Sequence, residues 1–175
     1  TKPVQDPVPV WWGGMGPANL RRSAERGFDL IAPFNAGYDH ALEAAGRNPA
    51  DHQVALMIPV FVDADADRAW EIAGPGLEYF VNFYQLRRNL QGEPAPAEAR
   101  VTVDMLRSGN AGFWFAAVGT PDDVIAQLRP VVAGQRLGRC TELALQLRQA
   151  GMSTADTHRG MRLLADEVMP ALLED

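Results

Sequence analysis

The run from Val54 to Val62 is the feature of this sequence that most limits how the chain can fold. It reads Val-Ala-Leu-Met-Ile-Pro-Val-Phe-Val and carries no charge. A strand that is apolar at successive positions is buried on both faces, which is a property of parallel sheets covered by helices. The run falls well short of the roughly 20 apolar residues that cross a bilayer. It therefore predicts a central strand of a parallel sheet.

Further strand-like and helix-like segments alternate around this run. The apolar patterns and their glycine or proline boundaries predict strands at 8–12, 28–34, 54–62 and 142–147. The same reasoning predicts helices at 18–26, 38–45, from 63–67 to about 84, from 121 to about 132, and from 154 to about 172. The order β-α-β-α-β-α-β-α implies right-handed crossovers and a parallel sheet. Four such units are half of an eightfold barrel, but they also suit a small open sheet.

Two stretches interrupt the pattern. Gly74-Pro75-Gly76 is expected to break or kink the long third helix. Residues 86–115 are expected to form an irregular insertion, because Pro94 and Pro96 disfavour regular structure there. We expect residues 1–175 to form a single domain. The chain opens on Thr1 without an initiator methionine and close to the first predicted strand. This suggests a cut through a longer protein, and processing or removal of a tag would look the same.

Charge and cysteine content narrow the possible partners. The net charge of −6 argues against a nucleic-acid groove, and the pairs Arg21-Arg22 and Arg87-Arg88 are interpreted as solvated helix faces. The single cysteine, Cys140, excludes an internal disulfide and favours a structural role in a reducing compartment. We find no signal peptide and no membrane span, so we expect a cytoplasmic protein.

The loop Gly13-Gly14-Met15-Gly16 is the best candidate for a binding site. Glycines allow backbone N–H groups to approach a phosphate, and the helix that follows adds its positive dipole end. A tight strand-to-helix turn explains the same glycines without any ligand. No Lys-Ser/Thr pair follows, so the loop is not a Walker motif, and the spacing does not fit the dinucleotide fingerprint.

Other polar residues at the predicted carboxyl ends of strands are weaker candidates. Asn35 and Gln146 could hydrogen-bond a cofactor ring, and Arg148 could neutralise a phosphate or a carboxylate. Ordinary loop and surface roles explain all three equally well. Asp63, Asp65 and Asp67 resemble the start of a calcium loop but lack its glycine and final glutamate, so they are interpreted as helix N-terminal carboxylates and no metal site is expected.

Three segments stand out, PVPVWWGGMGPANLRR at residues 7–22, GTPDDV at 119–124 and GMRLLADEVMPAL at 160–172. Together they resemble one family, the luciferase-like monooxygenases. Residues 7–22, which read PVPVWWGGMGPANLRR, are similar to its P-x-P-[IV]-W-[VW]-G-G-x-x-P-x-A-L-R-R motif, with Asn19 in place of Ala. Residues 119–124, GTPDDV, resemble its G-T-P-E-E-V helix start. Residues 160–172, GMRLLADEVMPAL, resemble its closing M-R-L-F-A-E-E-V-M-P-A-L. The three occur in family order over nearly the whole chain.

This resemblance implies an α/β fold, a parallel (β/α) barrel of the TIM type, of which about four βα units form this C-terminal half. It implies flavin-dependent oxidoreductase or monooxygenase chemistry on a small organic substrate, with FMN or alternatively coenzyme F420. The cofactor-binding residues would be Gly13, Gly14, Met15, Gly16, Asn35, Gln146 and Arg148. The usual catalytic histidines would lie in the other half, since His40, His52 and His158 match no family motif and the first and last are expected on exposed helix positions.

The sequence leaves two other functions open. One is a non-catalytic half-barrel that serves as an assembly or phosphate-binding module, and the other is an unrelated small α/β phosphate-binding domain. A half-barrel would leave apolar strand faces and two sheet edges uncovered. We therefore expect a homodimer, or association with the missing half of the barrel.

Overall fold

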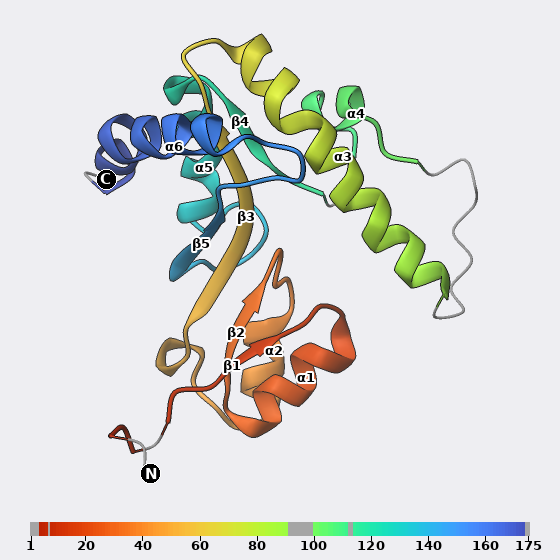
Figure 1. Cartoon of the computed structure of the whole chain (residues 1–175). Coiled ribbons are helices and arrows are strands. Elements are labelled where there is room, and N and C mark those ends of the chain that lie inside the picture. Colours follow the sequence, from red (N-terminus) through yellow and green to blue (C-terminus); the bar gives the residue numbers. More distant parts are fainter. Residues whose placement is uncertain (1–3, 7, 91–99, 112–113, 174–175) are drawn as a thin grey trace. The chain divides into compact units, whose positions relative to one another are not determined.

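Strand β3 (Val54–Val62) runs through both of the compact units into which the chain divides. The computed structural model describes residues 4–6, 8–90, 100–111 and 114–173 (Figure 1). The first unit falls within residues 1–57 and 129–144, and the second within 58–128 and 145–175. The first residues of β3 pair with β2, and its last residues pair with β4.

The first unit is a parallel sheet with helices on one face. Its complete elements are β1 (Trp11–Gly13), α1 (Pro17–Arg26), β2 (Asp29–Ala32), α2 (Tyr38–Ala44) and the short η1 (Pro49–Asp51). Strand β2 pairs in parallel with both β1 and β3. The start of β5 (Glu142–Gln146) also belongs to this unit, and β5 pairs with β3. Leu20 and Ala24 of α1 pack with Leu30, Leu42 and Val54 in the core.

The second unit places helices around the far half of β3. Its elements are α3 (Ala66–Leu90), α4 (Val103–Arg107), β4 (Ala117–Gly119), most of α5 (Pro121–Val132), α6 (Thr154–Leu163), the π-helical η2 (Leu164–Val168) and α7 (Met169–Leu173). Strand β4 pairs in parallel with β3, Val60 lying opposite Ala117. The core joins Phe61 of β3 to Trp70 and Leu77 of α3 and to Met152.

The expected α/β class with a parallel sheet is confirmed, and closure into a barrel stays a prediction. The third strand has the predicted bounds, and the strand at 142–147 ends one residue early. The first was predicted at 8–12, but β1 spans 11–13, and Val8 and Val10 are 50% and 41% exposed. Pro9 cannot donate a ladder hydrogen bond, so the pairing begins only after it.

One strand was not predicted, and another is shorter than expected. Strand β4 has only three residues and ends in a glycine, so it carries no alternating pattern. The strand predicted at 28–34 is β2 over 29–32, because Pro33 cannot extend the ladder.

The start of α5 is fixed by a reciprocal cap. The Thr120 hydroxyl accepts the N–H of Asp123 (3.3 Å), and the Asp123 carboxylate accepts the N–H of Thr120 (3.0 Å). Gly119 precedes them with φ of 151°, and a Cβ there would lie 2.7 Å from the Cβ of Asp123. The GTPDD sequence is thus a helix start that needs its glycine for space. The prediction of a helix from 121 to about 132 is confirmed.

Helix α3 is not broken at Gly74-Pro75-Gly76, contrary to the expectation of a break. The helix continues to Leu90 with Pro75 inside it and exposed to solvent. The two glycines are explained by close packing instead. A Cβ on Gly76 would lie 2.4 Å from the carbonyl oxygen of Ala150, and one on Gly74 would lie 2.8 Å from Val103.

The region predicted as an irregular insertion, 86–115, holds the end of α3 and all of α4, so it is more regular than expected. Residues 91–99 and 112–113 lie outside the described residues. The helix predicted from 154 to about 172 is divided by the π-helical η2. Leu164 and Val168 are buried, and Met161 is 43% exposed. The expectation of a single domain over 1–175 stays a prediction. Within the described residues, no helix is both long and apolar enough to cross a membrane.

Candidate functional site

The glycine-rich loop connects β1 to α1. Gly13 ends the strand, and Gly16 is the N-cap residue of the helix that begins at Pro17. Gly16 has φ of 85° and ψ of 157°, a conformation that is essentially restricted to glycine. A Cβ at Gly16 would meet no atom within 4 Å, so the backbone conformation and not space requires this glycine. At Gly14 a Cβ would lie 3.2 Å from the Asn19 side chain, which makes this position tight.

The loop presents N–H donors that no described residue of the chain accepts. Within the described part of the chain, no hydrogen bond takes up the N–H of Met15 or Gly16. The Asn19 amide donates to the Met15 carbonyl (2.9 Å) and so fixes the shape of the loop. The first turn of α1 has no acidic residue, so the positive end of its dipole is not neutralised locally. Free N–H groups at such a helix start fit a phosphate.

Asn35 serves as an internal anchor in this structure. Its side chain is buried, and its Nδ2 donates to the Arg139 carbonyl (2.6 Å). Its backbone N–H donates to the carbonyl of Leu137, a residue held at φ of 67°. A Cβ on Gly138 would lie 2.4 Å from the Asn35 oxygen, so this glycine lets the two segments meet. That Asn35 also contacts a cofactor ring stays a prediction.

Gln146 ends β5, and Arg148 lies in the loop between β5 and α6, both in the second unit. The Gln149 side chain is buried and donates to the Gln146 carbonyl (3.0 Å). Arg148 is exposed, and its guanidinium lies 3.4 Å from the carbonyl of the buried Met152. The loop is therefore anchored by Gln149 and Met152, with Arg148 facing solvent. Sequence analysis did not single out Gln149, because a lone glutamine carries no pattern.

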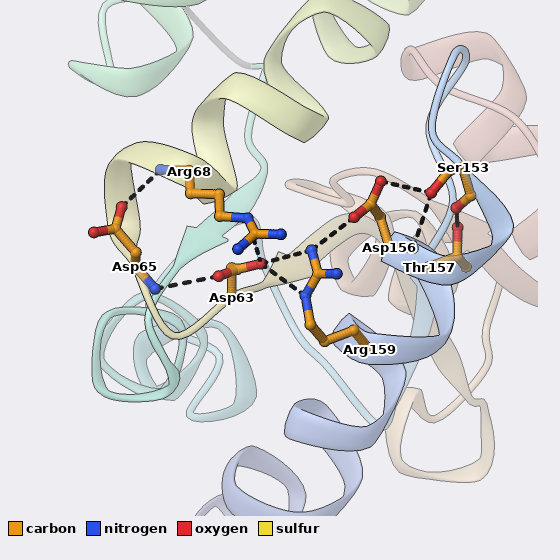
Figure 2. A network of polar contacts seen from close by, with 7 residues as sticks. All are labelled: Asp63, Asp65, Arg68, Ser153, Asp156, Thr157 and Arg159. Carbon is orange, nitrogen blue, oxygen red and sulfur yellow. Dashed lines mark hydrogen bonds and ion pairs between the residues drawn. The ribbon is translucent and has the colours of Figure 1, made fainter.

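A network of charged side chains joins the end of β3 to α6 (Figure 2). Asp63 follows β3 directly, and its side chain is only 4% exposed. Its Oδ2 accepts the Nε (3.1 Å) and one terminal nitrogen (2.9 Å) of Arg159. The Nε of Arg68 lies 3.8 Å from the same oxygen. Asp63 is thus a buried carboxylate that is paired with a partly exposed arginine.

The second carboxylate of the network lies at the start of α6. Asp156 accepts the same Arg159 nitrogen (2.7 Å), and its other oxygen accepts the Ser153 hydroxyl (2.6 Å). Ser153 in turn caps the helix by accepting the N–H of Asp156 (3.0 Å). Hydrogen bonds from Ser153, and then from Arg159, lower the pKa of Asp156. The hydrogen bond to Asp156, and then that to Asp63, raises the pKa of Arg159, so the pair stays charged.

The interpretation of the three aspartates as helix N-terminal carboxylates is correct for Asp65 and for Asp67, which lies in the first turn of α3, and it is incomplete for Asp63. Asp65 accepts the N–H of Arg68 (2.8 Å), as a helix cap does. Asp63 accepts the N–H of Asp65 (3.3 Å), but its main partner is Arg159, 96 residues away. Asp67 pairs with Arg107. In the described ranges, no group of three or more His, Cys, Asp or Glu side chains is arranged to hold a metal.

The histidines lie apart from this network. His40 is on α2 and His158 on α6, and both are exposed, as expected. His52 is nearly buried beside Asp29, with 3.8 Å between its Nδ1 and the carboxylate. It precedes β3, and residues at the amino ends of strands in parallel βα barrels usually contribute to stability and not to catalysis. No histidine joins the glycine-rich loop or the Asp63 network among the described residues.

Comparison with known proteins identifies the family. Residues 1–136 match the model of the luciferase-like monooxygenases. This chain belongs to the luciferase-like monooxygenase family. The match contains both the glycine-rich loop and the GTPDD helix start, so the resemblance drawn from these motifs is confirmed.

Solved structures agree with this luciferase-like fold. The oxygenating constituent of 3,6-diketocamphane monooxygenase from Pseudomonas putida, in complex with FMN, is 17% identical with a TM-score of 0.65, over 93% of this chain and 48% of its own. The coenzyme F420 dependent tetrahydromethanopterin reductase from Methanopyrus kandleri is 17% identical with a TM-score of 0.64, over 95% and 52%. A monooxygenase from Streptomyces bottropensis is 21% identical with a TM-score of 0.58, over 93% and 47%. The chain thus spans about half the length of these structures.

Proposed function

We propose that this chain is the phosphate-holding half of a flavin-dependent oxidoreductase, of the monooxygenase type, that acts on a small organic substrate. The single observation that carries the proposal is the loop 13–16, with its unused N–H groups at an unneutralised helix start. Family membership gives this loop a cofactor to hold, since one similar structure contains FMN and another depends on coenzyme F420. FMN is the first choice, and F420 is the alternative.

The residues present fit the phosphate of either cofactor. Met15 and Gly16 would donate their N–H groups to phosphate oxygens, and the dipole of α1 would stabilise the negative charge. A bound flavin would supply the redox chemistry. Arg148, exposed beside the anchored loop after β5, is available for a carboxylate of the substrate or for a phosphate. Gln146 is proposed as a hydrogen-bond partner of the cofactor ring.

The experiment compares FMN with riboflavin, which lacks the phosphate. Charge-assisted hydrogen bonds contribute about 1.5–3 kcal/mol, so FMN should bind about 10- to 100-fold more tightly than riboflavin. Quenching of flavin fluorescence on titration gives both dissociation constants. Gly16→Ala should remove most of this difference, because its φ of 85° is costly for alanine.

Gly46→Ala is the matched control. Gly46 also has a left-handed φ (72°) with no atom within 4 Å of an added Cβ, but it follows α2 and lies outside the loop. It should place an alanine at a position of positive φ outside the loop and leave the preference for FMN unchanged. If FMN and riboflavin bind equally, or if the two variants behave alike, the loop is only a turn and the proposal fails.

A non-catalytic phosphate-binding module is the second candidate. The observation in its favour is that none of the three histidines lies at the loop or at the Asp63 network in the described residues. Such a module would also bind FMN more tightly than riboflavin. It would not distinguish FMN from any other phosphomonoester, so inorganic phosphate would compete equally well against all of them. Preferential competition by other flavin phosphates favours the oxidoreductase. A cytoplasmic location stays a prediction.

A further inference from the structure

Asn19 lies in the first turn of α1 and contacts the glycine-rich loop through its side chain. Its Nδ2 donates to the Met15 carbonyl, four residues earlier, at 2.9 Å. The residue is partly buried, and a Cβ on Gly14 would lie 3.2 Å from it. The family motif has Ala at this position, and an alanine side chain cannot donate this hydrogen bond. The contact is therefore a feature that this chain adds to the motif.

The bond to the Met15 carbonyl also sets the direction of the Gly16 N–H. This carbonyl and this N–H belong to one planar trans peptide, in which they point to opposite sides. Because the carbonyl points toward the Asn19 amide, the N–H points away from it. Within the described residues no acceptor takes up that N–H. Asn19 therefore holds the donor in the orientation in which the chain itself does not use it.

The backbone at Gly16 would not hold this peptide by itself. Gly16 has φ of 85°, and a Cβ there would meet no atom within 4 Å. Turning over the peptide between Met15 and Gly16 would bring this φ to about −95°, and glycine populates both signs of φ about equally. In the turned-over peptide the N–H points toward Asn19, and the Met15 carbonyl oxygen takes its place. That oxygen would repel a phosphate.

We propose that Asn19 is a positioning residue, which fixes the peptide between Met15 and Gly16 so that its N–H faces the cofactor phosphate. The inference rests on the proposed function, in which the N–H groups of this loop hold that phosphate. An amide suits the task because it donates a hydrogen bond and carries no charge. A carboxylate at this position would only accept, and it would place a negative charge at the helix start that the phosphate needs.

Titration of FMN and of riboflavin into the substituted chains, followed by flavin fluorescence, tests this role. Asn19→Ala should lower the affinity for FMN about 3- to 10-fold, the effect of one neutral hydrogen bond, and should change that for riboflavin less than about twofold. Asn19→Asp should lower the FMN affinity further. Its thermal midpoint should nevertheless be no lower than that of Asn19→Ala, because a carboxylate in the first turn stabilises a helix.

Asn48→Ala is the matched control. The Asn48 side chain also bonds a backbone group of the first unit, the N–H of Ala50 at 3.2 Å, but it lies outside the loop. Its loss should leave the affinities for both flavins unchanged. Equal losses of affinity for FMN and riboflavin in Asn19→Ala are what a purely structural role predicts, and they would overturn the proposal.

Nuclear magnetic resonance tests the orientation of the peptide without any flavin. The nuclear Overhauser effect between the Met15 Hα and the Gly16 N–H depends on how this peptide is turned. Its intensity should change in Asn19→Ala and stay the same in Asn48→Ala. An unchanged effect in Asn19→Ala, or an unchanged preference of that variant for FMN, would show that Asn19 does not position the donor. Equal binding of FMN and riboflavin by the unsubstituted chain would instead contradict the proposed function, and this role with it.

Discussion

The Asp63–Arg159 ion pair predicts an unequal response to the loss of its two partners. Asp63 is 4% exposed and Arg159 is 37% exposed. Arg159→Met leaves a buried carboxylate with only Arg68 at 3.8 Å and one N–H at 3.3 Å, so we expect a loss of about 3–5 kcal/mol in unfolding free energy. Asp63→Asn leaves Arg159 with Asp156 at 2.7 Å and with access to water, so the expected loss is about 1–2 kcal/mol.

Urea unfolding followed by circular dichroism measures both losses. The double variant Asp63→Asn/Arg159→Met should cost less than the sum of the single variants by about 1–3 kcal/mol, since each removes the same interaction. Arg21→Met is the control, because the Arg21–Glu25 pair is 68% and 56% exposed and is worth about 0.5 kcal/mol or less. Equal losses from the two single variants, or losses no larger than that of the control, would refute the view that burial of Asp63 makes the pair asymmetric.

Three further predictions follow from single contacts. Gly76→Ala should destabilise the protein by about 1–3 kcal/mol and more than Gly74→Ala, as measured by thermal melting. The added methyl group meets the Ala150 backbone at Gly76, but at Gly74 it meets the Val103 side chain, which can move. The pKa of Asp156 is lowered in the folded chain, so its contribution to stability is present above its unfolded pKa and is lost as the pH falls through the folded value. The acid-unfolding curve of Asp156→Asn should therefore converge with that of the unsubstituted chain at low pH. Purified chain supplied with reduced flavin and oxygen should show little or no substrate turnover, and robust turnover would contradict the assignment of the catalytic groups to the other half.

The parts of the fold that could be predicted are those with a local signal. The uninterrupted apolar run gave the bounds of β3, and the hydroxyl-proline-carboxylate order gave the start of α5. Strand β4 could not be predicted, because its position is set by pairing with Val60 to Val62 and not by its own three residues. Gly74-Pro75-Gly76 was expected to break or kink α3, and the break does not occur. Local propensity cannot show that another segment packs against those glycines.

The residues of the candidate site also differ in whether a local sequence pattern reveals them. The glycine-rich loop is visible in the sequence because strand, glycines and helix start are consecutive. The Asp63–Arg159 pair has no such signal, since its members are 96 residues apart and each resembles an ordinary surface charge. Asn35 was predicted as a loop residue at a strand end, but its bond to Arg139 spans 104 residues and could be seen only in the fold.

The shared strand β3 also constrains how this sequence can change in evolution. Its first residues are held in register by β2 and its last residues by β4. An insertion or deletion of one residue between Met57 and Ile58 would reverse the facing of every later side chain in the strand. The ring of Phe61, which now lies against Gly160, would then take the place of a valine. Length variation among relatives should therefore fall in the connections and leave this strand at constant length.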